Sequence, residues 1–281
     1  MALCRASVIA PHAPFVAATC LCPDGSRTIG RHPHTFLSTS THSLMRAIAR
    51  FTLMTILFAL AGAGPLSAQS TVREAMDLSR LRVARDSFVV MLQGKPRGFQ
   101  RLTVARTATG WQFGDAVTVD SMVSQSSVAD FDQHLQEISL TQAGDMTGRR
   151  MAINLRFADG RVRGRSMTPV SGPTGAIEID TVIADGIPDD NAVLPMMAAI
   201  RWREGLSFTA PVLSSGRGTI TDYSFRVVGA EPVTVPAGEF TTWRVEQRAQ
   251  RSVTFVNVTT TPPYRIVRVS NGPVFEMLLV K

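Results

Sequence analysis

The chain has 281 residues and a formal net charge of +7, with three cysteines and five histidines. Five of the 29 Lys and Arg residues and one of the 22 acidic residues precede Gln69, which leaves residues 69–281 with a net charge of +3 and gives little support to a nucleic-acid partner. All three cysteines also precede Gln69, which excludes disulfides and thiolate chemistry from the rest of the chain.

The stretch after Met45 has the order of features that a secretory signal peptide requires. Arg46 and Arg50 supply positive charge, and an apolar segment from Phe51 to Ala61 follows them. This segment is shorter than the roughly 20 residues of a transmembrane helix. A small residue, Ala68, stands at the predicted cleavage point. We therefore predict an exported protein, periplasmic or secreted, that does not span the membrane after cleavage.

Three segments follow from this prediction. Residues 45–68 are the signal peptide, and residues 69–281 form a single β-rich exported domain. With translation starting at Met45, residues 1–44 are a spurious N-terminal extension. The alternative is a genuine cytoplasmic tail that precedes a signal anchor.

The exported domain begins with a short helical pattern, Val72 to Leu81, and then changes to strands. β-branched and apolar runs predict strands over 87–92, 99–107 and 111–119. The clearest unit is a hairpin in which apolar residues alternate from Met151 to Phe157. Its turn is Asp159-Gly160, a dipeptide that favours a two-residue type I′ turn.

Arginines gather on one side of this hairpin. The turn predicts pairs of Arg156 with Arg163 and of Asn154 with Arg165, and Arg161 points to the same side. Like charges opposite each other are unfavourable unless they are paired. Arg156, Arg161, Arg163 and Arg165 are therefore candidate anion-facing residues. The alternative is a solvated outer face with acidic partners from a neighbouring strand.

A strand over 177–183 precedes the one substantial helix that we predict in the second half. Asp189, Asp190 or Asn191 can cap it. It carries an apolar stripe at helical spacing and contains Pro195, which we expect near its first turn. Flexible methionine side chains adapt to apolar ligands. The candidate ligand-lining residues are Met196, Met197, Ile200 and Trp202, and the alternative is that they are simply core.

Further strands are predicted over 206–213, 218–228, 239–248, 252–259, 264–270 and 274–280, with turn residues between them. Twelve or so strands joined by short turns, without βαβ alternation, predict a mainly β fold. The expected architecture is a curved antiparallel meander that forms an incomplete barrel. One helix packs on or in its open face, and a short helix lies at the N-terminus.

Catalytic and cofactor motifs are absent from residues 69–281. His134 is the only histidine there, and Asp130, Asp132 and His134 would share one face if extended, a spacing that can hold a metal. The alternative is a solvated polar strand. No nucleophile elbow, phosphate-binding glycine loop or dinucleotide fingerprint occurs. We therefore expect no cofactor and no enzymatic activity.

The segment Val233-Thr-Val-Pro-Ala-Gly-Glu-Phe is followed by Pro263-Tyr-Arg-Ile-Val-Arg and by a closing strand with Glu276-Met-Leu-Leu. These residues resemble the C-terminal half of an uncharacterised family of exported bacterial β-proteins, known only as a domain of unknown function. The resemblance covers 232–281 well and 86–166 more loosely. That family is similar to lipoprotein-localisation carriers, which implies an incomplete barrel with helices over its open face but no catalytic residue.

These observations lead to two hypotheses about the function of the protein. The first is a non-enzymatic extracytoplasmic protein that binds a lipid, an acyl chain or another hydrophobic ligand in the half-barrel. The second is a cell-envelope assembly or scaffold factor that contacts an envelope protein partner, which predicts a packed interior. An enzyme would instead require His134 or an Asp cluster in a pocket with a perturbed pKa.

Overall fold

The structure is a computed structural model that describes residues 71–169 and 175–281. The predicted extension 1–44 and signal peptide 45–68 lie outside these residues. Within the described part of the chain, no helix is long and apolar enough to cross a membrane.

In the described residues, fourteen strands form one antiparallel sheet. Their bounds are Ala84–Leu92 (β1), Lys95–Arg106 (β2), Gly110–Val119 (β3), Val123–Asp132 (β4), Glu137–Met146 (β5), Arg149–Ala158 (β6), Arg161–Met167 (β7), Ile177–Val182 (β8), Ser207–Ser214 (β9), Thr219–Val235 (β10), Gly238–Ala249 (β11), Ser252–Thr259 (β12), Ile266–Asn271 (β13) and Phe275–Leu279 (β14). The order along the sheet is β8 back to β1, then β14 back to β9, because β1 pairs with β14. β8 and β9 are therefore its two edges, and the sheet is not closed.

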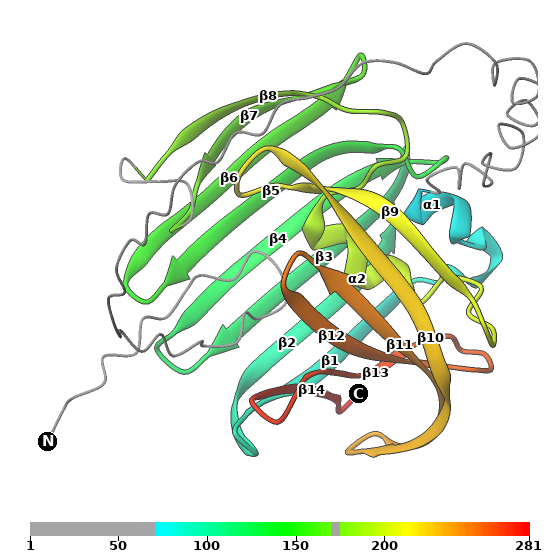
Figure 1. Ribbon diagram of the computed structural model, residues 1–281. Helices are drawn as coiled ribbons and strands as arrows, with labels where there is room; N and C mark the ends of the chain where they lie inside the picture. The colour runs from blue at the N-terminus through cyan, green and yellow to red at the C-terminus, as the bar shows by residue number, and fades with distance from the viewer. Residues whose placement is uncertain (1–70, 170–174) are drawn as a thin grey trace, which may run out of the picture. The chain divides into compact units, whose positions relative to one another are not determined.

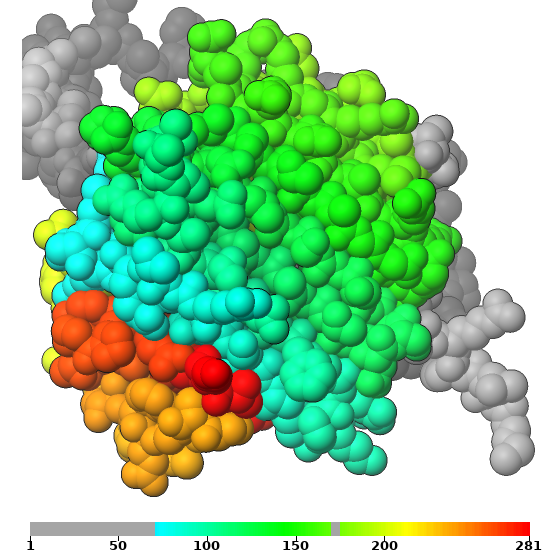
Figure 2. Space-filling model, turned by 180° about the vertical axis from the view of Figure 1, so that it is seen from behind, coloured from blue at the N-terminus to red at the C-terminus, as the bar shows by residue number. Residues whose placement is uncertain are grey.

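The sheet curls so that its two halves lie on either side of a central helix (Figure 1). We call the side that carries the buried residues the inner face. Figure 2 shows the outer face from behind, where the first strands, in cyan, lie beside the last strand, in red. The predicted fold class, an incomplete antiparallel barrel with one enclosed helix, is confirmed.

The N-terminal helix is shorter than the predicted 72–81. α1 covers Val72–Ala75, and a 3-10 turn covers Leu78–Arg80. Thr71 and Glu74 form a capping box at its start, whereas Met76 is already extended and pairs with Ile200 in an isolated bridge. The extended backbone that Met76 needs for this bridge cannot continue the helix, so α1 ends after one turn.

The central helix, α2, covers Asp190–Met197 and has Asp189 as its N-cap. The capping prediction is confirmed, but the expectation for Pro195 is wrong. Pro195 lies well inside the eight-residue helix rather than in its first turn. The missing N–H of this proline removes one intrahelical hydrogen bond, and the buried side chains around it hold the helix in place.

The hairpin of β6 and β7 is confirmed in register, with Arg156 opposite Arg163 and Asn154 opposite Arg165. Two strands, β4 and β5, fall where no strand was predicted. The proposed common face of Asp130, Asp132 and His134 is also wrong. β4 ends at Asp132, whose carboxylate accepts hydrogen bonds from the backbone N–H of His134 (2.7 Å) and of Gln136 (2.8 Å), so His134 lies in an exposed turn.

Candidate functional site

Three carboxyl groups meet at the start of α2. Asp189 and Asp190 open the helix, and Glu137 reaches them from the first residue of β5. The Glu137 side chain belongs to a residue that is 8% exposed, and Asp189 is completely buried. No Lys, Arg or His is among the buried residues of the described chain, so these acids have no buried cation to balance them. We call Glu137, Asp189 and Asp190 the carboxyl cluster.

Backbone and side-chain hydrogen bonds fix the cluster. Glu137 Oε2 accepts from the Asp189 backbone N–H at 2.8 Å, and Asp189 Oδ1 accepts from the backbone N–H of Asn191 at 2.7 Å. The two carboxyl groups lie close enough for the charge of Asp189 to act on Glu137. Glu137 Oε1 and Asp189 Oδ2 have no further partner among the described residues.

Glu137 is the member of this pair that more readily holds a proton. Burial raises the pKa of Glu137 well above its usual range, and the neighbouring charge of Asp189 raises it further. Burial also raises the pKa of Asp189, although the hydrogen bonds that it accepts from Asn191 oppose this rise. The pair therefore binds a proton more readily than isolated carboxyl groups do.

Asp190 extends the cluster toward the turn after β9. Its Oδ1 accepts a hydrogen bond from Ser215 Oγ at 2.6 Å, whereas Oδ2 has no partner among the described residues. Burial, followed by the charge of Asp189, raises the pKa of Asp190 to about 7. Tyr223 lies near both aspartates. Burial raises the pKa of its hydroxyl, and the charges of Asp190 and Asp189 raise it further. The cluster can therefore gain or lose a proton near neutral pH.

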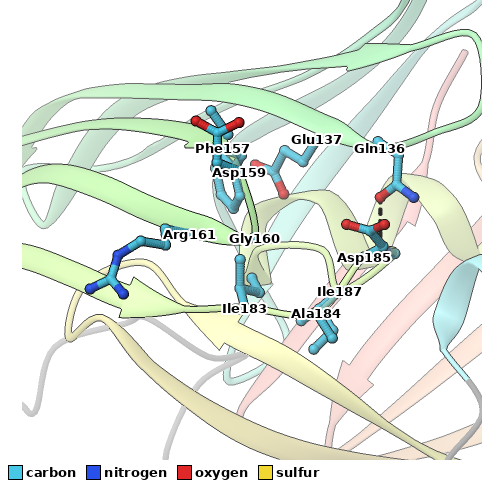
Figure 3. A pocket seen from close by; sticks show the side chains of 12 residues that line it. Gln136, Glu137, Phe157, Asp159, Gly160, Arg161, Ile183, Ala184, Asp185 and Ile187 are labelled. Atoms are coloured by element: carbon cyan, nitrogen blue, oxygen red, sulfur yellow. Dashed lines mark hydrogen bonds between the residues drawn. The ribbon is translucent and has the colours of Figure 1, made fainter.

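A pocket of about 170 Å³ adjoins the cluster. Its walls come from the start of β5, the turn between β6 and β7, and the segment 183–187 (Figure 3). Gln136 closes one side, where its Oε1 accepts a hydrogen bond from the Gly186 backbone N–H at 2.7 Å. Arg161 lines the opposite side, but its guanidinium group points away from Glu137 in Figure 3. In the described residues, no group of three or more His, Cys, Asp or Glu side chains is arranged to hold a metal ion.

The four predicted ligand-lining residues lie together in the core. Met197 and Ile200 are fully buried, and Met196 and Trp202 are almost so. Trp202 donates a hydrogen bond from Nε1 to the Met197 carbonyl at 2.8 Å and its ring is near that of Phe225. These contacts describe packed core in this conformation, and contact with a ligand stays a prediction.

The four predicted anion-facing arginines lie on the outer side of the hairpin, and acids on β8 accompany three of them. Arg161 and Arg163 contact Asp180 at 2.7 and 3.4 Å, and Arg165 contacts Glu178 at 3.5 Å. Arg156, opposite Arg163, forms no ion pair in the described residues. The arrangement matches the alternative of acidic partners on a neighbouring strand, while anion binding remains a prediction.

Glu137 was not predicted from the sequence as a site residue, and Asp189 and Asp190 were predicted only as helix caps. The two aspartates were assigned to helix capping, which is correct for Asp189 but omits the long-range partner. Glu137 is separated from Asp189 by 52 residues, and it lies in a polar stretch that gives no strand signal. An acidic residue at an inward position of a strand would have been the signal, had β5 been recognised.

The family model of a protein of unknown function, DUF3108, matches residues 75–279. The chain belongs to the DUF3108 family. The predicted membership of an uncharacterised β-protein family is thus confirmed. Among curated proteins, none matches this sequence.

Solved structures similar to this DUF3108 protein are distant in sequence. A β-barrel-like protein of the DUF1849 family from Brucella abortus is 10% identical, with a TM-score of 0.47, and the match covers 72% of this chain and 97% of that one. A putative exported protein with a YmcC-like fold from Bacteroides fragilis is 11% identical, with a TM-score of 0.27 over 70% of this chain and 93% of that one. A putative lipoprotein from Parabacteroides distasonis is 9% identical, with a TM-score of 0.25 over 72% and 97%.

Proposed function

We propose that this protein is an extracytoplasmic, non-enzymatic binding protein that holds a lipid or another ligand with an acyl chain against the inner face of its sheet. The size of the unclosed sheet carries this proposal. A closed barrel of about eight strands is already filled by its own side chains or holds one small ligand. The fourteen strands of the described residues present a larger inner face than such a barrel, and α2 contributes only eight residues to cover it.

α2 is suited to leave its place when a ligand enters. Isolated helices shorter than about 12 residues are marginal in water, so packing must hold this one. Pro195 removes one of its internal hydrogen bonds, and its N-terminus depends on carboxyl groups that repel one another when ionised. Its departure would expose the apolar side chains of Met196 and Met197 together with the inner face that they cover.

Two sequence features support the location and the ligand class. The signal-peptide pattern of residues 45–68 favours export. The resemblance of residues 232–281 to relatives of lipoprotein-localisation carriers favours an acylated ligand. A non-enzymatic role agrees with the single histidine in residues 69–281, because general acid and base catalysis most often uses histidine.

A reversible lock on α2 tests this function. Met76 and Ile200 form an isolated antiparallel bridge, and backbone hydrogen bonds on both sides of it make them a pair with Cα atoms about 4.5 Å apart. This separation lies within the range that a disulfide spans, about 4.4 to 6.8 Å. The double variant Met76→Cys, Ile200→Cys therefore ties the end of α2 to the segment after α1. Any native cysteines retained in the purified protein are first replaced by serine.

Uptake of the apolar fluorophore N-phenyl-1-naphthylamine and of oleate is then measured with and without reductant. We expect little uptake by the oxidised variant and clearly greater uptake by the same protein after reduction, which serves as its own control. Equal uptake in both states would show that α2 does not move aside. No uptake by the wild-type protein would refute ligand binding.

The complete burial of Met197 and Ile200 favours a second candidate, an envelope assembly or scaffold factor with a packed interior. This function predicts that neither probe binds and that the disulfide does not change the contact with the envelope partner. Cross-linking in the periplasm through an outer-face residue such as Arg156 would then capture a specific envelope protein.

A further inference from the structure

Polar side chains form a continuous group on the inner face of β2 to β5. Asp115 on β3 is opposite Ser127 on β4, and Ser127 is opposite Gln142 on β5. Gln125 lies two residues before Ser127 and therefore on the same face. Gln100 on β2 joins the group from the other side. We call these five residues the inner polar group.

One end of the inner polar group is satisfied. Gln100 Nε2 donates to both carboxylate oxygens of Asp115, at 2.9 and 2.8 Å. Burial raises the pKa of Asp115 to about 7, although this hydrogen bond opposes the rise. The Asp115 carboxyl group can therefore act as an acceptor when ionised and as a donor when protonated near neutral pH.

The other end is not satisfied. The residue Gln142 is 1% exposed, and neither its amide nitrogen nor its amide oxygen has a hydrogen-bond partner among the described residues. The buried Oε1 of Gln125 also lacks a partner there. An atom of this kind is unfavourable in the interior if nothing bonds to it. Native interiors rarely leave such atoms without a partner, so Gln142 points to a bound group.

The chemistry of this group is restricted. Its free atoms are the donor and acceptor of one amide and the acceptor of another, and no Lys, Arg or His is among the buried residues of the described chain. A phosphate or carboxylate would therefore meet no buried cation. A neutral group that carries hydroxyls or an amide can satisfy both kinds of free atom.

Apolar surface borders the inner polar group. Leu140 precedes Gln142 by two residues on β5, Phe113 precedes Asp115 by two on β3, and both are buried. The helix α2 contacts β2, β3 and β4, the strands that carry most of the group. A ligand with a polar head at Gln142 would therefore place an attached apolar chain where α2 now packs.

We infer that Gln142, with Gln125 and Asp115, is the head-group site for an amphipathic ligand with a neutral, hydroxyl- or amide-bearing head and an apolar chain. This inference rests on the proposed function, because it assigns the head group of the ligand that the inner face would hold. It excludes anionic lipids as the preferred ligand. It also gives the unpaired amide of Gln142 a function.

The test compares head groups on one acyl chain. Displacement of N-phenyl-1-naphthylamine from the full chain is measured with 1-monooleoylglycerol, oleate and 1-octadecene. We expect monooleoylglycerol to bind about tenfold more tightly than the other two, the equivalent of about one net hydrogen bond.

The variant Gln142→Leu has a similar volume and lacks both free amide atoms. We expect it to lose the tenfold preference while N-phenyl-1-naphthylamine binds as before. Gln112→Leu on β3 is the matched control, because Gln112 bonds to Asp130 outside the inner polar group, and it should keep the preference. If Gln142→Leu does not fold by circular dichroism, Gln142→Met replaces it.

The outcomes separate the two proposals. Binding of all probes with no head-group preference, or a preference that survives Gln142→Leu, overturns the head-group site and leaves the binding function standing. Ordered water would then be the partner of Gln142. If no probe displaces or binds at all, the binding function fails and the head-group site fails with it.

Discussion

Replacing Asp190 by asparagine should make the protein more stable at alkaline pH. Asparagine keeps the Oδ1 that accepts from Ser215 and cannot ionise beside Asp189. In the wild type, burial and the charge of Asp189 raise the pKa of Asp190 from 3.8 to about 7 on folding. The folded state therefore binds this proton more tightly than the unfolded state. The free energy of unfolding must fall as the pH rises from about 4 through about 7.

The size of the expected change in the free energy of unfolding follows from the pKa shift of Asp190. Three pH units at about 1.4 kcal/mol each give an upper limit of about 4 kcal/mol. Asp190 keeps some exposure to solvent, which screens the charge, so about 2 kcal/mol is the expected gain for Asp190→Asn at pH 8. At pH 4 the carboxyl group is protonated in the folded protein, and the variant and the wild type should be equally stable.

Urea unfolding of both proteins at pH 4, 6 and 8, followed by circular dichroism, measures this difference. Asp159→Asn is the matched control, because Asp159 is exposed in the β6–β7 turn and this substitution should leave the pH dependence unchanged. A difference between Asp190→Asn and the wild type that stays constant from pH 4 to pH 8 would refute the assignment of a half-buried Asp190 that titrates near neutral pH.

Three further substitutions have expected outcomes. Glu137→Gln removes a buried group whose pKa is raised by burial and by the charge of Asp189, so its free energy of unfolding should match the wild type at pH 4 and exceed it at pH 8 in the same urea series. Trp202→Ala removes a buried ring from its contact with Phe225 and should lower the free energy of unfolding by about 3 to 5 kcal/mol. Arg165→Ala breaks an exposed ion pair at 3.5 Å and should change stability by less than about 1 kcal/mol in thermal unfolding.

Local patterns in the sequence were enough to predict the hairpin of β6 and β7. Apolar alternation sets its faces, and Asp159-Gly160 sets its register because both residues adopt positive φ, +52° and +67°. The antiparallel meander and the capped helix α2 follow from the same kind of signal. Each of these features depends on residues close together in the chain.

The site depends on residues that are far apart, and the sequence could not bring them together. β4 and β5 were missed because their inner faces carry Ser127, Gln142 and Glu137, which break the alternation of apolar and polar residues. Those same polar residues build the carboxyl cluster and the inner polar group. A strand that places polar side chains inside a core contradicts the pattern used to recognise strands, so the residues of most functional interest were the hardest to place.

The pairing of β1 with β14 has a consequence for how the chain folds. β1 and β14 lie side by side in the middle of the sheet, so the edge of β1 that faces away from β2 stays unpaired until β14 has been synthesised. Exposed edges of this kind recruit other strands and lead to aggregation. Contacts between such distant segments also form slowly. Synthesis of β14 is therefore the event that allows the two halves of the sheet to join, and a chain truncated before Phe275 would keep an open edge at the centre of the sheet.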